Sequence, residues 1–168
     1  MSCTIRAARE SDTTAIARLA GELGYPSSAD EALTRLQSVA NRKEDGAFVA
    51  EHDGSVAGWM HVFVANRLES DPFVEIAGLV VADGSRGLGI GKALVETAER
   101  WARERGYRSV RVRSNVIRTE AHRFYENLGY RRVKAQAVRL IACADDGITV
   151  RGLDAIDGTP VLDIKPYF

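Results

Sequence analysis

Four segments of the chain carry apolar residues three or four positions apart, a pattern that predicts helices with one face toward a core. The first helix is expected after a cap at Ser11 or Asp12, with Gly24 ending it. Ser28 and Glu31 have the spacing of a capping box, so they predict the start of the second helix. The other two predicted helices run from Ile90 to Gly106 and from Thr119 to Gly129.

Between these helices lie segments with the patterns of strands. "GAFVAEHDGSVAGWMHVFVA" predicts a hairpin, because Asp53-Gly54 supplies the positive φ that a tight turn needs. "FVEIAGLVVA" is apolar without alternation, so we expect a strand buried on both faces. Further strands are expected at "CTIRAA", "SVRVRS" and "RRVKAQAVRLIA". This order of elements predicts the α/β class, with a mixed central β-sheet flanked by helices.

Composition places the chain in a broad class. A length of 168 residues suits one domain, and 45% hydrophobic with 27% charged residues is typical of a soluble globular protein. We find no signal-peptide pattern, no apolar run that could span a membrane and no C-x-x-C pair formed by Cys3 and Cys143. We therefore expect a cytoplasmic protein without a membrane partner.

The charge is unevenly distributed along the chain. The formal net charge is zero, yet residues 100–139 hold twelve Lys or Arg against three Glu. Such a group of cations could attract a polyanionic small molecule. The neutral total and the lack of an aromatic-rich basic stripe do not favour nucleic acid as a partner.

The segment "LVVADGSRGLGIGKAL", residues 79–94, has glycines between two cations and predicts a phosphate-binding loop. A dinucleotide fingerprint needs G-x-G-x-x-G, whereas the third glycine here comes one position early. A nucleoside triphosphate loop needs a hydroxyl residue after Gly91-Lys92, where this chain has Ala93. The pattern that fits is R-x-x-G-x-G, formed by Arg86, Gly89 and Gly91.

Together with the later "RVRSN" and "EAHRFYENLGYRRV", this loop makes residues 3–138 resemble the GCN5-related N-acetyltransferase (GNAT) family. The resemblance implies the fold of that family and acetyl-coenzyme A as co-substrate. It assigns coenzyme A binding to Leu79, Val80, Val81, Arg86, Gly87, Leu88, Gly89, Ile90, Gly91, Lys92, Asn115 and Tyr125. Asp83 stands where many relatives have proline, and we expect it to alter the turn rather than the phosphate site.

The resemblance also implies catalytic residues. Glu75 is similar to a family glutamate that serves as general base, and His61 on the neighbouring strand is the reserve base. Tyr125 is similar to a family tyrosine that lies near the coenzyme A sulfur and serves as general acid. The structural alternative for Glu75 is a charged residue at a strand start that points to solvent. The structural alternative for Tyr125 is a half-buried aromatic of the core.

The implied reaction is direct transfer of an acetyl group to a primary amine in a ternary complex. Acidic residues within 21–30 and 61–75 favour a cationic acceptor, either a small molecule or a peptide amine. No cluster has metal-ligand spacing, so no metal is expected. A non-catalytic acyl-coenzyme A-binding sensor or assembly module is the alternative function.

Residues 139–168 lie beyond the acetyltransferase pattern, so we predict an acetyltransferase domain over 1–138 and a separate tail. Asp146-Gly147 between two apolar runs predicts a hairpin, and Pro160 and Pro166 predict an extended segment after it. The stretch "DGTPVLDIKPY" resembles the end of the TsaA-like barrel of tRNA methyltransferases that use S-adenosylmethionine. Most of that barrel is missing, so methyltransferase activity is not expected. We expect the hairpin to extend the acetyltransferase sheet or to pair with a second subunit in a homodimer.

Overall fold

The computed structural model describes residues 3–112, 119–131, 139–144 and 147–151. Its helices and strands are β1 (Cys3–Ala7), α1 (Thr13–Glu22), α2 (Ala29–Ala40), β2 (Asp45–His52), β3 (Ser55–Arg67), β4 (Ser70–Val81), α3 (Ile90–Glu104), β5 (Val110–Val112), α4 (Thr119–Asn127), β6 (Arg139–Ala144) and β7 (Gly147–Arg151). The chain divides into two compact units, Met1–Arg113 and Ser114–Phe168. Among the described residues, no helix is long and apolar enough to cross a membrane.

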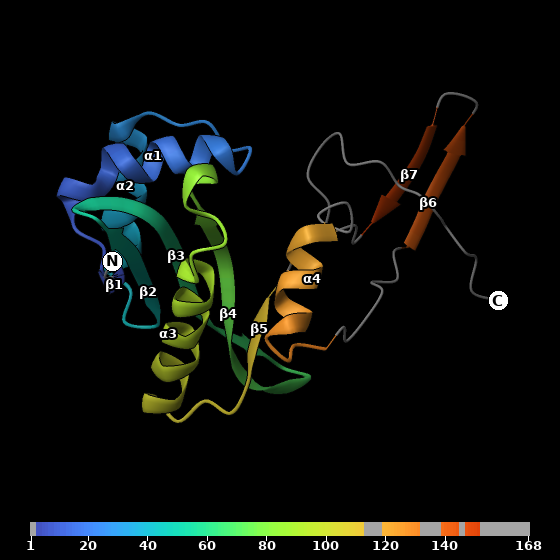
Figure 1. Cartoon of the computed structure of the whole chain (residues 1–168). Helices are drawn as coiled ribbons and strands as arrows, with labels where there is room; N and C mark the ends of the chain where they lie inside the picture. Colours follow the sequence, from blue (N-terminus) through green and yellow to red (C-terminus); the bar gives the residue numbers. More distant parts are fainter. Residues whose placement is uncertain (1–2, 113–118, 132–138, 145–146, 152–168) are drawn as a thin grey trace. The chain divides into compact units, whose positions relative to one another are not determined.

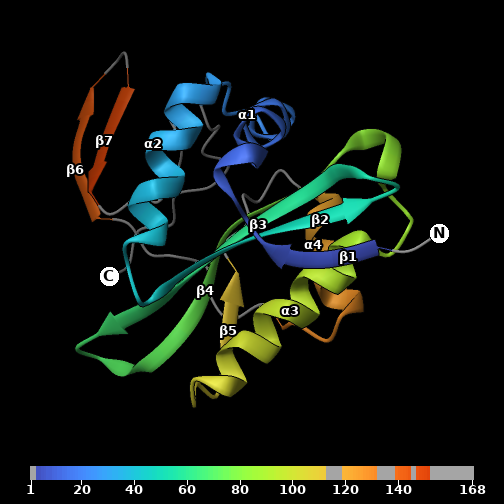
Figure 2. The same cartoon turned by 90° about the vertical axis from the view of Figure 1, so that its left-hand side faces the viewer.

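The first unit is built on a five-stranded sheet in the order β1-β2-β3-β4-β5. Neighbouring strands are antiparallel from β1 to β4, whereas β5 pairs parallel with β4. Helices α1 and α2 lie on one face of the sheet and α3 lies on the other (Figure 1 and Figure 2). The predicted mixed sheet flanked by helices is therefore confirmed.

The core lies between the sheet and its helices. The predicted apolar stripe of α3 is buried along its whole length: Ile90, Leu94, Val95, Ala98, Trp101 and Ala102. A Cβ atom on Gly58 of β3 would lie 3.4 Å from Leu94 Cδ1 and 2.8 Å from the carbonyl oxygen of Val80. The backbones of β3 and β4 thus approach too closely at this point for a side chain, whereas Leu94 of α3 lies at an ordinary contact distance.

Local signals in the sequence have the expected structures. Ser28 Oγ accepts a hydrogen bond from the Glu31 N–H at 3.1 Å, and Glu31 Oε2 accepts one from the Ser28 N–H at 2.8 Å, so the capping box is complete. Asp53 and Gly54 both have positive φ, at 48° and 75°, as a tight hairpin turn requires. Asp12 is the residue that precedes α1, but its side chain does not cap the helix.

Instead, Asp12 fixes the junction of β1 with α1. Its two carboxylate oxygens accept hydrogen bonds from Arg6 Nη1 and Nη2 at 2.8 and 2.9 Å, and the Arg9 N–H donates another at 2.8 Å. Arg6 Nε also bonds Glu51 at 2.9 Å. The hydrogen bonds between Arg6 and Asp12 hold the pKa of Asp12 below its usual value. The same hydrogen bonds raise the pKa of Arg6. We call this cluster of Arg6, Asp12 and Glu51 the β1 corner.

The second unit contains α4 and the hairpin of β6 and β7, which form a two-stranded sheet of their own. The predicted hairpin is confirmed, and its described strands pair with each other. Its extension of the five-stranded sheet and its pairing with a second subunit both stay predictions. The predicted boundary at residue 138, Asp146 and the extended segment within 152–168 lie outside the described residues.

Candidate functional site

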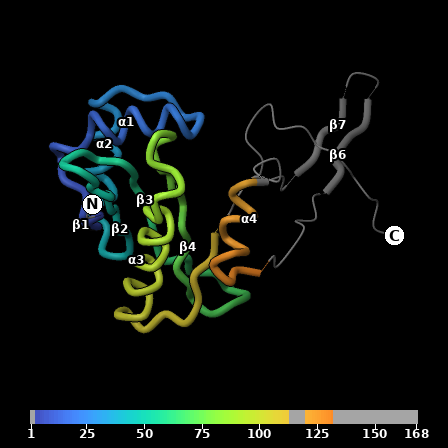
Figure 3. The backbone as a smooth tube through the Cα atoms, in the orientation of Figure 1, coloured from blue at the N-terminus to red at the C-terminus, as the bar shows by residue number. Residues whose placement is uncertain are grey.

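The loop of residues 82–89 joins β4 to α3 and has the backbone of an anion site; we call it the glycine loop. Figure 3 traces the chain from β4 through this loop into α3. Gly87 and Gly89 have φ angles of 78° and 79°, a region where other residues are strained. No heavy atom lies within 4 Å of the position that a Cβ would take on either residue. Phosphate oxygens therefore have room to approach the first N–H groups of α3, which have no partner within the helix.

The other predicted residues of the loop differ in what they can offer a ligand. Arg86 and Lys92 have side chains that are 58% and 62% exposed, so both cations are accessible. Leu88 is also exposed, whereas the side chain of Ile90 is buried in the core. Ile90 can therefore contribute only its backbone, and Gly91 lies in the first turn of α3.

Asp83 begins the short turn Asp83–Ser85 of the glycine loop, and its side chain contacts a residue that the sequence assigns to phosphate binding. Its Oδ1 lies 2.6 Å from Arg86 Nη2, so its carboxylate pairs with a predicted phosphate ligand rather than only reshaping the turn. Lys92 has an acid partner as well, because its Nζ lies 3.8 Å from Glu96 Oε1. Arg86 of the glycine loop and Lys92 of α3 thus both contact carboxylates.

The end of β4 has a backbone edge that no described strand covers, and this edge leads into the glycine loop. Leu79, Val80 and Val81 pair with β3 on one side. On the other side β5 pairs with β4 only from Val74 to Ile76, so no described strand covers the edge beyond it. The register of the β3–β4 pairing shifts just beyond Ile76, between Ile76 and Gly78. An extended ligand such as the pantetheine arm of coenzyme A fits this edge as an added strand would.

Glu75 lies within β4 and is buried, with 6% of its surface exposed. The strand begins at Ser70, so Glu75 is not at a strand start and does not point to solvent. Its Oε2 lies 3.7 Å from Arg67 Nη2, and in the ladder it is paired with Phe63 on one side and Arg111 on the other. A buried carboxylate is thus held just before the part of β4 that no described strand covers.

His61 lies on the same face of the sheet as Glu75. Phe63 of β3 is paired with Glu75, and His61 is two residues from Phe63, so the three side chains share a face. Its ring Nε2 is 3.4 Å from Asp45 Oδ2, and the Asp45 side chain is only 3% exposed. The His61 side chain is 29% exposed and is paired with Gly78 in the ladder. The sequence pattern did not identify Asp45, since it stands sixteen residues away from His61 and is joined to it only by strand pairing.

Tyr125 belongs to the second unit and is buried. Its ring makes edge-on contacts with those of Phe124 and Tyr130, at centroid distances of 5.0 and 5.7 Å. Burial raises the pKa of the Tyr125 phenol to about 12. The phenol therefore keeps its proton at neutral pH, as a general acid must. Asn115 lies outside the described residues.

Some of the acidic residues expected to attract a cation form ion pairs with arginines. Glu22 Oε1 lies 2.8 Å from Arg18 Nη1, and its Oε2 accepts a hydrogen bond from the Asp83 N–H at 3.1 Å. Glu69 lies 3.8 Å from Arg67. Within the described ranges, no group of three or more His, Cys, Asp or Glu residues is placed to hold a metal ion.

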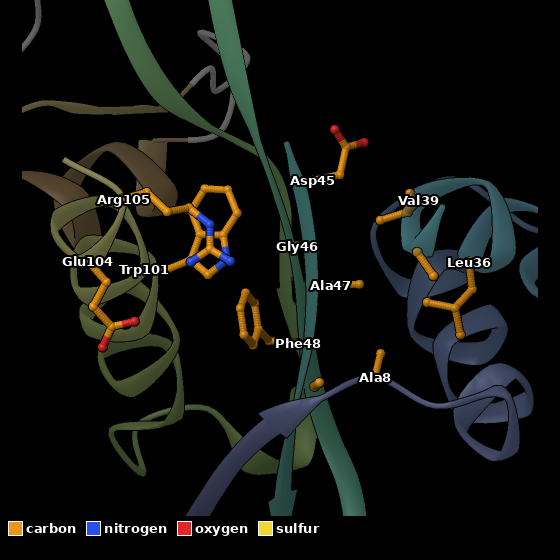
Figure 4. Close-up of a pocket in the computed structure, with 12 residues that line it drawn as sticks. Ala8, Leu36, Val39, Asp45, Gly46, Ala47, Phe48, Trp101, Glu104 and Arg105 are labelled. Carbon is orange, nitrogen blue, oxygen red and sulfur yellow. The ribbon is translucent and has the colours of Figure 1, made fainter. Parts of the chain in front are cut away.

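A pocket of about 430 Å³ lies elsewhere in the first unit, between α2, the start of β2 and the end of α3. Figure 4 shows Trp101 and Phe48 on the α3 side of β2, with Leu36 and Val39 on the α2 side. Strand β3 separates β2 from β4 in the sheet, so this pocket is not part of the candidate coenzyme A site.

Comparison with known proteins identifies two families along the chain. The model of the Acetyltransferase (GNAT) family matches residues 12–130, and that of the tRNA-methyltransferase O N-terminal domain matches residues 110–168. Both resemblances seen in the sequence are thereby confirmed. The second match begins earlier than the tail and overlaps the first at β5 and α4.

Individual relatives agree with the first match. Aminoglycoside N(6')-acetyltransferase type 1 of Stenotrophomonas maltophilia is 31% identical over 76% of this chain and 85% of that protein. Aminoalkylphosphonate N-acetyltransferase of Salmonella typhimurium is 31% identical over 77% of this chain and 86% of that protein. The solved aminoglycoside N-acetyltransferase AAC(6')-Iy in complex with CoA aligns with a TM-score of 0.73 at 20% identity, covering 84% of this chain and 96% of that one. This last likeness concerns the fold alone.

Proposed function

Because the chain belongs to the acetyltransferase (GNAT) family, we propose that it transfers the acetyl group of acetyl-coenzyme A to a primary amine by direct attack in a ternary complex. It is an acyltransferase with acetyl-coenzyme A as co-substrate. The observation that carries the proposal is the edge of β4 beyond Ile76, which no described strand covers and which runs directly into the glycine loop. A turn that only reversed the chain would need neither this edge nor glycines with open space at both 87 and 89.

In this proposal the backbone of Leu79–Val81 binds the pantetheine arm, and the glycine loop binds the pyrophosphate. Arg86 and Lys92 add charge beside the N-terminus of α3, whose dipole also favours anions. A backbone N–H of β4 faces the thioester oxygen and stabilises the negative charge that develops there. Asn115 is assigned to coenzyme A by the family resemblance.

Glu75 is the proposed general base. The acceptor arrives mainly as an ammonium ion and must lose a proton before its nitrogen can attack the thioester carbon. The new carbon–nitrogen bond then forms as the carbon–sulfur bond breaks, and Tyr125 gives its proton to the departing thiolate. The products are the amide, coenzyme A as the thiol, and one released proton. His61, oriented by Asp45, is the alternative base.

For the acceptor we propose a small-molecule or peptide primary amine with cationic character. Two relatives support a small amine, since one is named for aminoglycosides and the other for aminoalkylphosphonates. Glu22 and Glu69 are weaker support for a cationic acceptor than the sequence suggested, because both already contact arginines. A homodimer and a cytoplasmic location stay predictions from the sequence.

The test is release of free thiol from acetyl-coenzyme A in the presence of a panel of amines, each matched with an analogue that has hydroxyl in place of the amine. The panel should include aminoglycosides, aminoalkylphosphonates, polyamines and peptides with a free N-terminus. Amine-dependent thiol release with formation of the N-acetyl product supports the proposal. Tight binding of acetyl-coenzyme A without turnover on any amine would favour the non-catalytic binding module.

A further inference from the structure

The ion pair between Asp83 and Arg86 lies on the surface of the glycine loop. The two side chains are 71% and 58% exposed, and Asp83 Oδ1 lies 2.6 Å from Arg86 Nη2. The backbone of Asp83 is held in place, because its N–H donates to Glu22 Oε2 at 3.1 Å and its carbonyl accepts from the Arg86 N–H at 3.4 Å. The carboxylate is therefore presented to Arg86 by a fixed turn.

A pyrophosphate bound to this loop would meet Asp83 in two ways. It would need the Arg86 guanidinium, which the carboxylate already contacts. It would also bring negative charge close to a negative carboxylate, and like charges repel at such short range. An exposed ion pair is weak, commonly about 0–1 kcal/mol, so a ligand can displace it. The pair thus lowers affinity without blocking the site.

We propose that Asp83 is an internal competitor of the coenzyme A pyrophosphate for Arg86, and that it sets the affinity for coenzyme A. The inference rests on the proposed binding of coenzyme A to the glycine loop. Acetyl-coenzyme A and the product coenzyme A share the pyrophosphate, so the competition acts on both. Its consequence is faster release of coenzyme A after transfer, because the carboxylate recaptures Arg86 as the ligand leaves.

The experiment measures coenzyme A binding by calorimetry and its dissociation rate by stopped flow, in wild type and in Asp83→Asn. At low ionic strength, the variant is expected to bind about three- to tenfold more tightly, with most of the change in the dissociation rate. The gain should shrink toward nothing at about 1 M salt, where the Debye length is about 3 Å. The matched control is Glu104→Gln, which removes the same charge at the opposite end of α3, roughly 20 Å away.

A double-mutant cycle with Arg86→Gln separates competition from simple repulsion. Arg86→Gln alone should weaken binding, and adding Asp83→Asn should then raise affinity by clearly less than it does in wild type, because only the direct repulsion remains to be removed. An undiminished gain in the Arg86→Gln background would overturn the inference, as would a gain that does not depend on salt or an equal gain in Glu104→Gln. If wild type and Asp83→Asn both fail to bind coenzyme A, the assignment of the glycine loop is wrong; if wild type binds and Asp83→Asn binds no better, only the competition is wrong.

Discussion

Two pairs of arginine and aspartate have similar distances in this protein and very different surroundings. In the β1 corner, Arg6 and Asp12 are 2.8 Å apart, and their side chains are 23% and 5% exposed. In the glycine loop, Arg86 and Asp83 are 2.6 Å apart and both are mostly exposed. The first carboxylate accepts three hydrogen bonds, so it is held from several sides.

The difference shows that burial and the number of partners decide what an ion pair does. Removing one partner of a largely buried, hydrogen-bonded pair leaves the other charge uncompensated, so breaking the β1 corner should destabilise the fold. An exposed pair contributes little to stability and can yield its arginine to a ligand. Substitutions in the β1 corner should therefore change stability, whereas substitutions along β4 and the glycine loop should change binding or turnover.

The largest effect is expected at Glu75, which is buried like Asp12 but lies just before the part of β4 that no described strand covers. Glu75→Gln should lower turnover by roughly 10²- to 10⁴-fold with little change in coenzyme A affinity. The deficit should shrink as the pH rises, because the amine then loses its proton without a base. Steady-state rates from pH 6 to pH 10 measure this.

Glu69→Gln is the matched control, because Glu69 also contacts Arg67 but is 72% exposed. It should show no deficit that varies with pH. If Glu75→Gln and Glu69→Gln behave alike, Glu75 acts through Arg67 and is not the base. If the deficit of Glu75→Gln is the same at every pH, Glu75 positions the substrate and His61 becomes the candidate base.

Tyr125 provides a second comparison with Asp12, because burial rather than a charged partner among the described residues shifts its pKa. Tyr125→Phe should reduce turnover by about 10²-fold if the phenol is the general acid. Burial raises its pKa from 10.0 to about 12, so its contribution to stability is complete below pH 10 and is lost as the pH rises toward 12. Wild type should therefore lose about 1.4 kcal/mol more than Tyr125→Phe between pH 9 and pH 11 in denaturant titrations. Wild-type rates in the variant would assign Tyr125 to the core alone.

In the β1 corner, Asp12→Asn should lower the free energy of unfolding by about 2–3 kcal/mol at pH 7. Arg6 lowers the pKa of Asp12 below 3.8, so this stabilisation is present above pH 3.8 and is lost as the pH falls through the folded-state pKa. The two proteins should therefore converge in stability on acidification, as followed by denaturant titration. Coenzyme A affinity should not change; a large loss of binding would mean that the β1 corner also positions the site.

The smallest effects are expected from the glycines. Gly89→Val should weaken coenzyme A binding by about tenfold or more, because Gly89 has positive φ and its open side is where a phosphate would lie. Gly84→Ala should change it by less than about twofold, since Gly84 has no positive φ and a Cβ there meets nothing within 4 Å. Calorimetry measures both affinities, and circular dichroism checks that Gly89→Val folds. Equal small losses would mean that the loop only reverses the chain.

The sequence by itself determined the features that depend on neighbours along the chain. The capping box at Ser28, the tight turn at Asp53-Gly54 and the stripe of α3 depend on spacings of four residues or fewer. The positive φ of Gly87 and Gly89 likewise follows from local backbone sterics. The loop proposed to bind coenzyme A could therefore be recognised as a glycine turn before any tertiary structure was known.

The tertiary structure decided which charged groups meet. Arg6 is paired with Glu51 across forty-five residues, and His61 with Asp45 across sixteen, because strand pairing brings them together. Burial of Glu75 within β4 depends on the strands on either side of it, which no local pattern specifies. The contact between Asp83 and Arg86 could not be predicted either, although the two residues are only three positions apart. Spacing alone does not say where a side chain points, so the contact became visible only in the folded turn. Electrostatic contacts depend on distance in space, and only the folded chain sets that distance.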